Sequence, residues 1–398
     1  MGYTYKYGGG ELSKNMSLAL LLTNLFIAFL GIGLVIPVLP TIMNELNLSG
    51  KMVGYLVSAF AISQLLVSPL SGKWVDQYGR KTMIVIGLLI FSFSEFLFGL
   101  GKTVEVLFIS RLLGGVSAAF IMPAVTAFIA DITTMEMRSR AMGYMSAAIS
   151  TGFIIGPGIG GFLAELGTRV PFFAAAVVAL ISALASLILL KEPERYKSAV
   201  IEAKTSGLGR IFNPLYFLAF LIIFIAQFGL AAFDSLFSLF VDRKFGFTPK
   251  DIAIIITGGG LVGALAQVFL FDRLTQKFGE VKLIRYSFIF SAILVVVTTM
   301  VNSYFNILLA TIFIFVGFDL MRPAVTSYLS KVAGNEQGFV SGMNSMFTSF
   351  GNMFGPIVGG ILFDINLDYP FYFTALALIV GIGLTYFWKQ PTYQEEIS

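Results

Sequence analysis

Apolar stretches of membrane-spanning length recur from one end of this chain to the other, and few folds can accommodate them. A helix that crosses a lipid bilayer needs about 20 mainly apolar residues. Charged residues make up only 12% of the chain, whereas soluble domains carry roughly 25%. The sequence therefore predicts an all-α integral membrane protein with twelve transmembrane helices, at 17–39, 52–71, 82–100, 103–129, 140–164, 170–190, 213–241, 250–271, 283–301, 304–329, 338–363 and 369–388.

The two halves of the sequence repeat one another. The motif Gly-x-x-x-Gly-Pro-x-x-Gly-Gly occurs as GFIIGPGIGG at 152–161 and as GNMFGPIVGG at 351–360. PAVT at 123–126 and 323–326 recurs at nearly the same offset, as do PFF at 171–173 and PFYF at 370–373. A constant offset indicates duplication, so we expect two pseudo-symmetric six-helix bundles. The predicted segments are a polar tail 1–16, a first bundle 17–190, a cytoplasmic linker 191–212, a second bundle 213–388 and a tail 389–398.

Positive charges set the expected orientation, because Lys and Arg concentrate on the cytoplasmic side of a membrane. Most of the 26 Lys and Arg residues lie in the tails, the linker and the loops on the same side as these. We therefore expect both termini in the cytoplasm.

Missing residue types exclude several functions. The chain has no cysteine and no histidine, so it has no disulfide, no Cys-ligated metal and no catalysis of the His-dependent kind. No phosphate loop of the Gly-x-x-x-x-Gly-Lys-Ser/Thr type occurs, so we expect no direct use of ATP. We expect no catalytic residues, no metal and no cofactor, and a net charge of +4 gives no indication of nucleic-acid binding.

Five charged residues fall inside predicted helices: Glu95, Arg111, Asp234, Asp319 and Arg322. A charge at mid-bilayer costs roughly 2.5–3.5 kcal/mol on insertion scales, so such residues face a partner or a cavity. Asp319 and Arg322 are three residues apart and share a helix face. They fit either a neutralising pair or a cavity charge that binds protons or a cationic substrate. The second hypothesis is favoured, since the repeated PAVT at 123–126 has no accompanying Asp.

Asp234 has no basic residue within one helical turn in LAAFDSLFSLF. Desolvation favours the neutral form of such a carboxyl group, which suits a proton carrier. The alternative is a helix that ends early and leaves Asp234 in water. The neighbouring rings of Phe233, Phe237 and Phe240 either attract an organic cation or make ordinary lipid and helix contacts.

Arg111 and Glu95 lie in the first predicted bundle. A buried Arg111 needs either an acceptor or a role in proton transfer. Glu95 lies about a turn and a half from a helix end. It therefore fits snorkelling to the membrane surface as well as it fits a functional role.

Two glycine-containing motifs suggest moving parts. Gly152, Gly156 and Gly160 form a smooth strip around Pro157, which permits close helix packing and a bend. In the loop GKWVDQYGRK at 72–81, Gly79 permits a tight turn, while Asp76 and Arg80 can form a latch of ion pairs. The corresponding positions 276 and 280 are Gln and Glu, so the second half is predicted to keep the turn without the charges.

These motifs resemble the drug/proton antiporter branch of the major facilitator superfamily. The likeness covers the chain after residue 16 and rests on GKWVDQYGRK, RLLGG at 111–115, GFIIGPGIGG, which is typical of exporters, and LGIGLVIPVLP. Within the branch, the likeness is to multidrug efflux pumps of Gram-positive bacteria. It implies an exporter of the bacterial cytoplasmic membrane, with a cavity between its halves.

The resemblance also implies residue roles. Asp234, Asp319 and Arg111 would take part in proton coupling. Asp76, Arg80 and Gly79 would form a cytoplasmic gate. The positions that would line the substrate cavity are Arg322, Phe60, Gln64, Met122, Phe153, Phe237 and Asn344.

We therefore expect a proton-coupled multidrug antiporter that exports hydrophobic, often cationic compounds such as dyes, quaternary ammonium compounds and fluoroquinolone-like drugs. Its expected partners are these substrates, protons and the lipid bilayer, and a monomer would suffice for function. A proton-coupled exporter of a natural metabolite such as a polyamine is the alternative. An importer is disfavoured by the exporter-type motif at 152–161, and a membrane-embedded enzyme or receptor-like sensor by the lack of His and Cys and of a further soluble domain.

Overall fold

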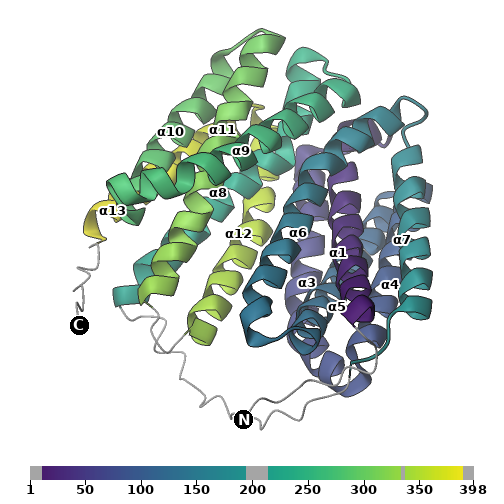
Figure 1. Ribbon diagram of the computed structural model, residues 1–398. Helices are drawn as coiled ribbons and strands as arrows, with labels where there is room; N and C mark the ends of the chain where they lie inside the picture. Colours follow the sequence, from purple (N-terminus) through teal and green to yellow (C-terminus); the bar gives the residue numbers. More distant parts are fainter. Residues whose placement is uncertain (1–10, 194–213, 333–336, 389–398) are drawn as a thin grey trace, which may run out of the picture. The chain divides into compact units, whose positions relative to one another are not determined.

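The computed structural model describes residues 11–193, 214–332 and 337–388, and within them the chain is entirely helical. Thirteen helices are described (Figure 1): α1 (Glu11–Leu34), α2 (Leu39–Glu45), α3 (Gly50–Tyr78), α4 (Arg80–Leu100), α5 (Val104–Ile132), α6 (Met135–Ala164), α7 (Val170–Leu189), α8 (Pro214–Phe245), α9 (Pro249–Phe278), α10 (Glu280–Met300), α11 (Tyr304–Val332), α12 (Gln337–Ile365) and α13 (Tyr369–Phe387).

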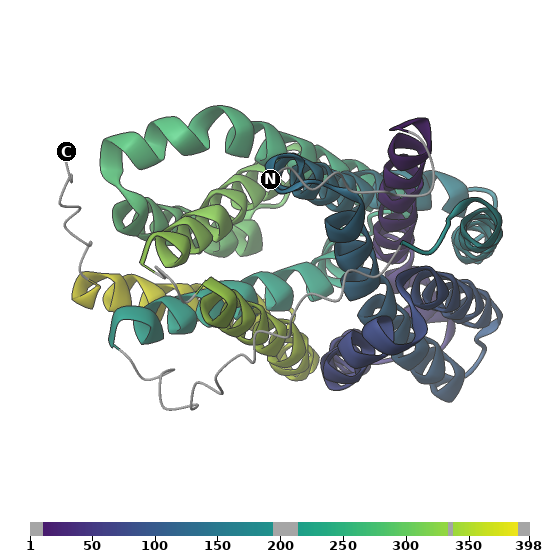
Figure 2. The same ribbon diagram turned by 60° about the horizontal axis from the view of Figure 1, so that its bottom comes forward.

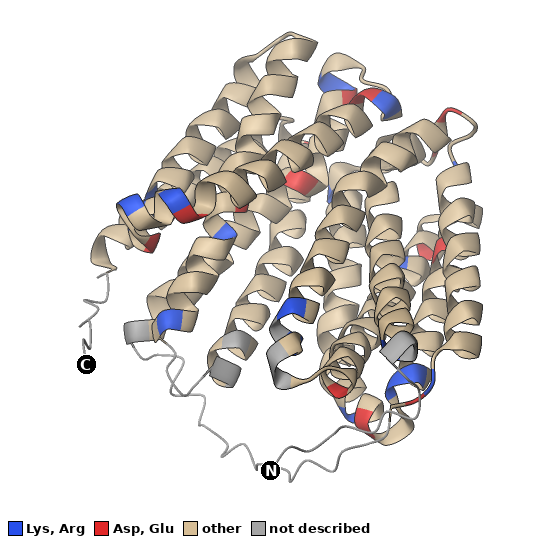
Figure 3. Cartoon of the chain, viewed as in Figure 1, with Lys and Arg blue, Asp and Glu red and all other residues tan. Residues whose placement is uncertain are grey.

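Twelve of these helices are long and apolar enough to cross a membrane, which confirms the all-α architecture with twelve predicted spans. Most positions along the helices are uncharged in Figure 3, and the Lys, Arg, Asp and Glu residues gather mainly near helix ends. A few charged positions lie midway along helices.

The first predicted span is wrong at both ends. Helix α1 begins at Glu11, inside the stretch predicted as a polar tail, and ends at Leu34. A turn at 35–38 follows, and Pro40 then opens the short helix α2. Val35 and Val38 are buried, so apolar character continues through a break in the helix. Hydropathy alone could not locate that break. The tail at 389–398 and most of the predicted linker at 191–212 lie outside the described residues.

The chain divides into two compact units. The first unit comprises residues 1–47, 59–203 and 248–254, and the second unit comprises 48–58, 204–247 and 255–398. Within the first unit, α1 packs against α6 and α7, and α4 packs against α5 and α7. Within the second unit, α8 packs against α12 and α13, and α10 packs against α11 and α13, as Figures 1 and 2 show.

The glycine strip of α6 explains its close packing on α1. A methyl group on Gly156 would meet the Leu30 carbonyl oxygen at 2.6 Å, and one on Gly152 would meet the Phe26 carbonyl oxygen at 2.7 Å. Gly160 faces Leu34 in the same way, and Pro157 packs on Gly33. Only glycine lets the two backbones come this close. The repeated motif does the same in the second unit, where Gly351 and Gly355 face Phe228 of α8.

Candidate functional site

Asp234 and Asp319 are the two acidic residues of interest in the second unit. Helix α8 continues unbroken to Phe245, so the alternative of an early helix end at Asp234 is wrong. Both side chains are half-buried. Among the described residues, neither carboxylate forms a hydrogen bond or an ion pair. Each therefore keeps its oxygens available for a proton or a cationic group.

Asp319 lies against a glycine of the neighbouring helix α9. A methyl group built on Gly263 would collide with the Oδ2 atom of Asp319. One turn away, Gly259 faces the ring of Phe315, so two glycines of α9 receive two side chains of α11. Sequence reasoning missed Gly263, although the glycine-rich run TGGGLVG at 257–263 was the available signal. Gly263 thus provides the room in which the Asp319 carboxylate lies.

Arg322 and Asn344, two expected substrate contacts, lie on α11 and α12 of the second unit. Arg322 is exposed on α11, and no ion pair joins it to Asp319 within the described residues. The two charges still interact electrostatically over a longer distance, so the neutralising pair and the cavity charge both stay predictions. Asn344 is half-buried on α12, where its Oδ1 atom has no partner among the described residues.

A second polar contact in this unit was missed by sequence reasoning. Gln227 of α8 donates a hydrogen bond through Nε2 to Oδ1 of Asn352 on α12, at 2.6 Å. Gln227 is seven residues before Asp234, so both lie on nearly the same face of α8. Asn352 lies within the repeated motif GNMFGPIVGG at 351–360, and a polar residue in this motif was the available signal.

Phe237 is a correction to the expected substrate contacts. Its side chain is 1% exposed, and its ring stacks on Phe233 with centroids 5.2 Å apart. Phe233 and Phe240 both pack against Phe371 of α13. These rings form the core of the second unit, so the ordinary helix-contact alternative describes Phe237 in this structure.

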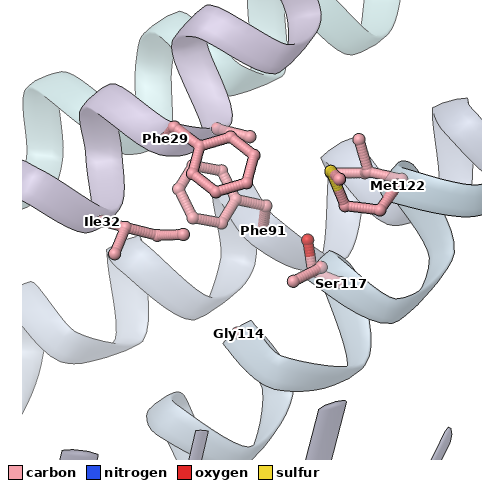
Figure 4. Close-up of a pocket in the computed structure, with 9 residues that line it drawn as sticks. Phe29, Ile32, Phe91, Gly114, Ser117 and Met122 are labelled. Carbon is pink, nitrogen blue, oxygen red and sulfur yellow. The ribbon is translucent and has the colours of Figure 1, made fainter. Parts of the chain in front are cut away.

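The first unit has a small apolar pocket among α1, α4 and α5 (Figure 4). Met122 lines it together with Phe29, whose ring lies 4.9 Å from that of Phe153 on α6. Two expected substrate contacts, Met122 and Phe153, are thus brought near one another through Phe29, which sequence reasoning missed. The pocket is lined by Ala28, Phe29, Ile32, Phe91, Gly114, Ser117, Ala118, Ile121 and Met122.

Phe60 and Gln64 lie on α3, where it packs against the RLLGG motif. The Phe60 ring would be 3.1 Å from a methyl group on Gly114, and a methyl group on Gly115 would collide with the Phe60 carbonyl oxygen. Ser63, between them, donates a hydrogen bond to the Leu112 carbonyl oxygen at 2.7 Å. The two glycines of RLLGG therefore allow α3 to pack closely on α5. This close packing holds Phe60 and Gln64 at the contact between the two helices.

Arg111 finds its acceptor on the neighbouring helix α4. Its Nη2 atom lies 3.1 Å from Oε1 of Glu95, and its guanidinium carbon lies 4.3 Å from the centre of the Phe98 ring. Glu95 is only 1% exposed. The snorkelling interpretation of Glu95 is therefore wrong, because the side chain points into the first unit and not toward a membrane surface.

Arg80 joins four segments at the start of α4. Its side chain forms ion pairs with Asp76 at 3.1 Å and with Asp131, at the end of α5, at 2.9 Å. Gly79 has a φ of 103°, a conformation that favours glycine. The Glu192 carboxylate accepts hydrogen bonds from the backbone N–H groups of Arg80 and Lys81, which satisfies the helix start. Asp131 and Glu192 were missed, since their distance in sequence gave no sign of the contact.

The second unit keeps this ion pair with its signs reversed. Glu280 begins α10, and its Oε1 atom pairs with Nζ of Lys331 at the end of α11, 2.5 Å away. Both residues lie 200 positions after the first pair, Arg80 and Asp131. The predicted turn is present, since Gly279 has a φ of 77°, but the expectation that this half lacks the charges is wrong because Glu280 pairs with Lys331. Comparing Asp76 and Arg80 with positions 276 and 280 could not show it, because the partner lies on another helix.

These features define a multi-pass helical membrane protein built from two repeated units. The Major Facilitator Superfamily model matches residues 21–243 and 219–398, and the chain belongs to this superfamily. It is 68% identical over 381 residues to Multidrug resistance protein 1 of Bacillus subtilis, covering 96% of this chain and 98% of that protein. It is 42% identical to the quinolone resistance protein NorA of Staphylococcus aureus, covering 94% and 97%. The likeness to multidrug efflux pumps of Gram-positive bacteria is confirmed.

Solved structures agree with the fold. A bacterial homologue of the human lysosomal transporter Spinster matches with a TM-score of 0.82 at 16% identity, covering 95% of this chain and 97% of that one. The nucleoside transporter NupG matches with a TM-score of 0.77 at 17% identity, covering 94% and 99%. At such identities the likeness concerns the fold alone.

Proposed function

We propose that this chain is a proton-coupled multidrug exporter that works by alternating access. The observation that carries the proposal is the pair of acids Asp234 and Asp319, half-buried in membrane-spanning helices without an ion pair among the described residues. The names of its relatives support multidrug efflux.

Asp234 and Asp319 could exchange a proton for a cationic substrate. A deprotonated carboxylate attracts a cationic compound, and a protonated one does not. Protons that enter from outside would neutralise Asp234 and Asp319, weaken cation binding and favour release. Such competition couples two ligands whenever they prefer different states of the protein. The inward proton gradient is then the energy source, without a cofactor.

Apolar groups explain why the substrate range would be broad. The pocket of Figure 4 offers the side chains of Phe29, Phe91 and Met122, with Phe153 packed behind Phe29. Flexible methionine and aromatic surfaces adapt to ligands of different shape. In the first unit, Phe60 would extend this apolar surface and Gln64 would add a polar contact. In the second unit, Arg322 and Asn344 would offer polar groups to a substrate. Arg111 keeps its expected role in coupling, and Asp76 and Arg80 keep theirs in gating.

The test is transport by purified protein in liposomes with an imposed pH gradient and ethidium as substrate. We expect uphill dye movement by the wild-type protein, its loss in Asp319→Asn, and its retention in the exposed-site control Asp272→Asn. Failure of the wild-type protein to move ethidium or other lipophilic cations would overturn the multidrug proposal. Movement of a polyamine in the same liposomes would then support the metabolite exporter.

A further inference from the structure

The ion pair of Glu95 and Arg111 lies in the interior of the first unit and is incompletely satisfied. Glu95 is 1% exposed and Arg111 is 8% exposed. A single contact of 3.1 Å joins Nη2 to Oε1. The second carboxylate oxygen, Oε2, and the Nε atom of Arg111 are both buried without a hydrogen-bond partner among the described residues.

Such a pair contributes poorly to stability. Desolvating two charges is offset only by excellent geometry and by hydrogen bonds to the remaining polar atoms. A two-bond guanidinium–carboxylate contact would have supplied both. Here one carboxylate oxygen and one guanidinium nitrogen are left unsatisfied, so stability does not explain why the pair is present.

The helices around the pair are held rigidly. Ser94 and Ser110, the immediate neighbours of Glu95 and Arg111, donate hydrogen bonds to each other's carbonyl oxygens at 2.8 and 2.9 Å. Ser117 donates to the Gly87 carbonyl oxygen across the same two helices. The backbones of α4 and α5 are thus clamped, and a rearrangement at the pair involves only its side chains and a proton.

No other charged group competes for Glu95 in the described part of the unit. Helix α5 presents Arg111, and its other charged residues lie at its two ends. Helix α7 approaches with Ala176 and the Phe172 ring, while Arg169 at its start bonds carbonyl oxygens at the end of α4. Along α1 the charged residues, Glu11 and Lys14, fall within its first four positions. Arg111 is therefore the one charge that Glu95 meets directly.

We propose that Oε2 of Glu95 is a proton-binding site in the first unit, separate from the acids Asp234 and Asp319 of the second unit. A proton taken up from solution forms an O–H bond at Oε2 and leaves Glu95 neutral. Arg111 then loses its counter-ion, while Oε1 of the neutral carboxyl group can still accept the hydrogen bond from Nη2 and the guanidinium stays over the Phe98 ring. Loss of that proton to solution restores the ion pair. The role of this site in the transport cycle rests on the proposed proton coupling, but its titration does not.

The direct test is infrared difference spectroscopy of the purified full-length protein during a pH titration. We expect a buried protonated-carboxyl band that is present in the wild-type protein and absent in Glu95→Gln. Glu105→Gln, at an exposed acid near the start of α5, is the matched control and should keep the band. If wild-type protein and Glu95→Gln give the same bands across the titration, Glu95 binds no proton and the proposal fails.

A second pair of variants covers the case in which Glu95→Gln does not fold, because it leaves Arg111 buried without a counter-ion. Glu95→Gln/Arg111→Gln removes both charges and should fold while lacking the band. Glu95→Asp should keep a band with a shifted midpoint. Persistence of the wild-type band in the double variant would also overturn the proposal.

A transport assay then tests the role of the Glu95 site in the transport cycle separately from the proposed function of the protein. In liposomes, Glu95→Gln should lose gradient-driven ethidium accumulation while still binding the dye at equilibrium. Accumulation as strong as in wild type would show that this proton site is not part of the cycle. If the wild-type protein itself moves no dye, the proposed function fails, and the infrared result still decides whether Glu95 takes a proton.

Discussion

The Asp319 carboxylate lies against Gly263, so the size of one residue on α9 controls the position of a proposed proton-binding group on α11. Gly263 has no chemistry of its own, and it acts only through the space that its missing side chain leaves. Residues of this kind are invisible to a search for charged or polar groups.

Gly263→Ala should displace the Asp319 carboxylate and strongly reduce ethidium transport in liposomes. The atom displaced is the far end of a flexible side chain, so we expect little loss of stability beside the loss of transport. Gly258→Ala is the matched control on the same helix, because a methyl group there would meet nothing within 4 Å. Equal transport rates for the two variants would contradict the assigned role of Gly263.

At the scale of helices, missing side chains also allow close packing. Glycines of α6 face backbone atoms of α1, and glycines of α12 face backbone atoms of α8. Gly156→Ala should therefore lower the unfolding temperature of the purified protein, with about 1–3 kcal/mol of lost stability. Gly143→Ala, earlier on α6 with no neighbour within 4 Å, should leave it unchanged or slightly raised. If Gly156→Ala unfolds at the same temperature as Gly143→Ala, the close packing of α6 on α1 does not contribute to the stability of the protein.

The ion pair of Glu280 and Lys331 links the start of α10 to the end of α11. Glu280→Lys and Lys331→Glu should each place like charges together and destabilise the protein. The double exchange should recover about 0.2–1 kcal/mol, the usual range for a partly exposed pair. Thermal unfolding at low salt would measure this recovery. Strictly additive effects of the two substitutions would mean that the side chains do not interact.

At the scale of the whole molecule, twelve spans and the bias of Lys and Arg predict cytoplasmic termini. The chain has no cysteine, so single cysteines can be introduced without a background. We expect a membrane-impermeant maleimide to label Ser303→Cys in intact cells, since that residue lies between α10 and α11. Gln77→Cys, at the end of α3, should react only after lysis. The reverse pattern would invert the assigned orientation.

Much of the fold was accessible from the sequence. Twelve apolar stretches predicted twelve spans, because lipid leaves the helix as the way for a single apolar segment to satisfy its backbone. Helix ends were less accessible: the turn after Leu34 is as apolar as the helix before it. Candidate charges were also found, since a charge within an apolar stretch is conspicuous wherever it occurs.

The sequence did not show which side chain each candidate residue contacts. The sequence identified Arg111 and Glu95 as charges that each need an explanation, but it did not pair them, because they lie on different helices. It identified Arg80 without Asp131 and Glu280 without Lys331 for the same reason. It also placed Phe237 in the substrate cavity, whereas this ring is buried and stacks on Phe233, which packs against Phe371 of α13. Burial depends on which helix lies opposite, and hydropathy does not report that.

By itself, the sequence determined that this chain is a duplicated helical membrane protein with charges inside its spans, because these properties follow from composition, spacing and repetition along one chain. Only the tertiary structure decided which helix each charge faces. It showed that Glu95 meets Arg111 and that Asp319 meets the open space at Gly263. Contacts between helices depend on the rotation and register of each helix against its neighbours, and those are fixed by packing across the fold.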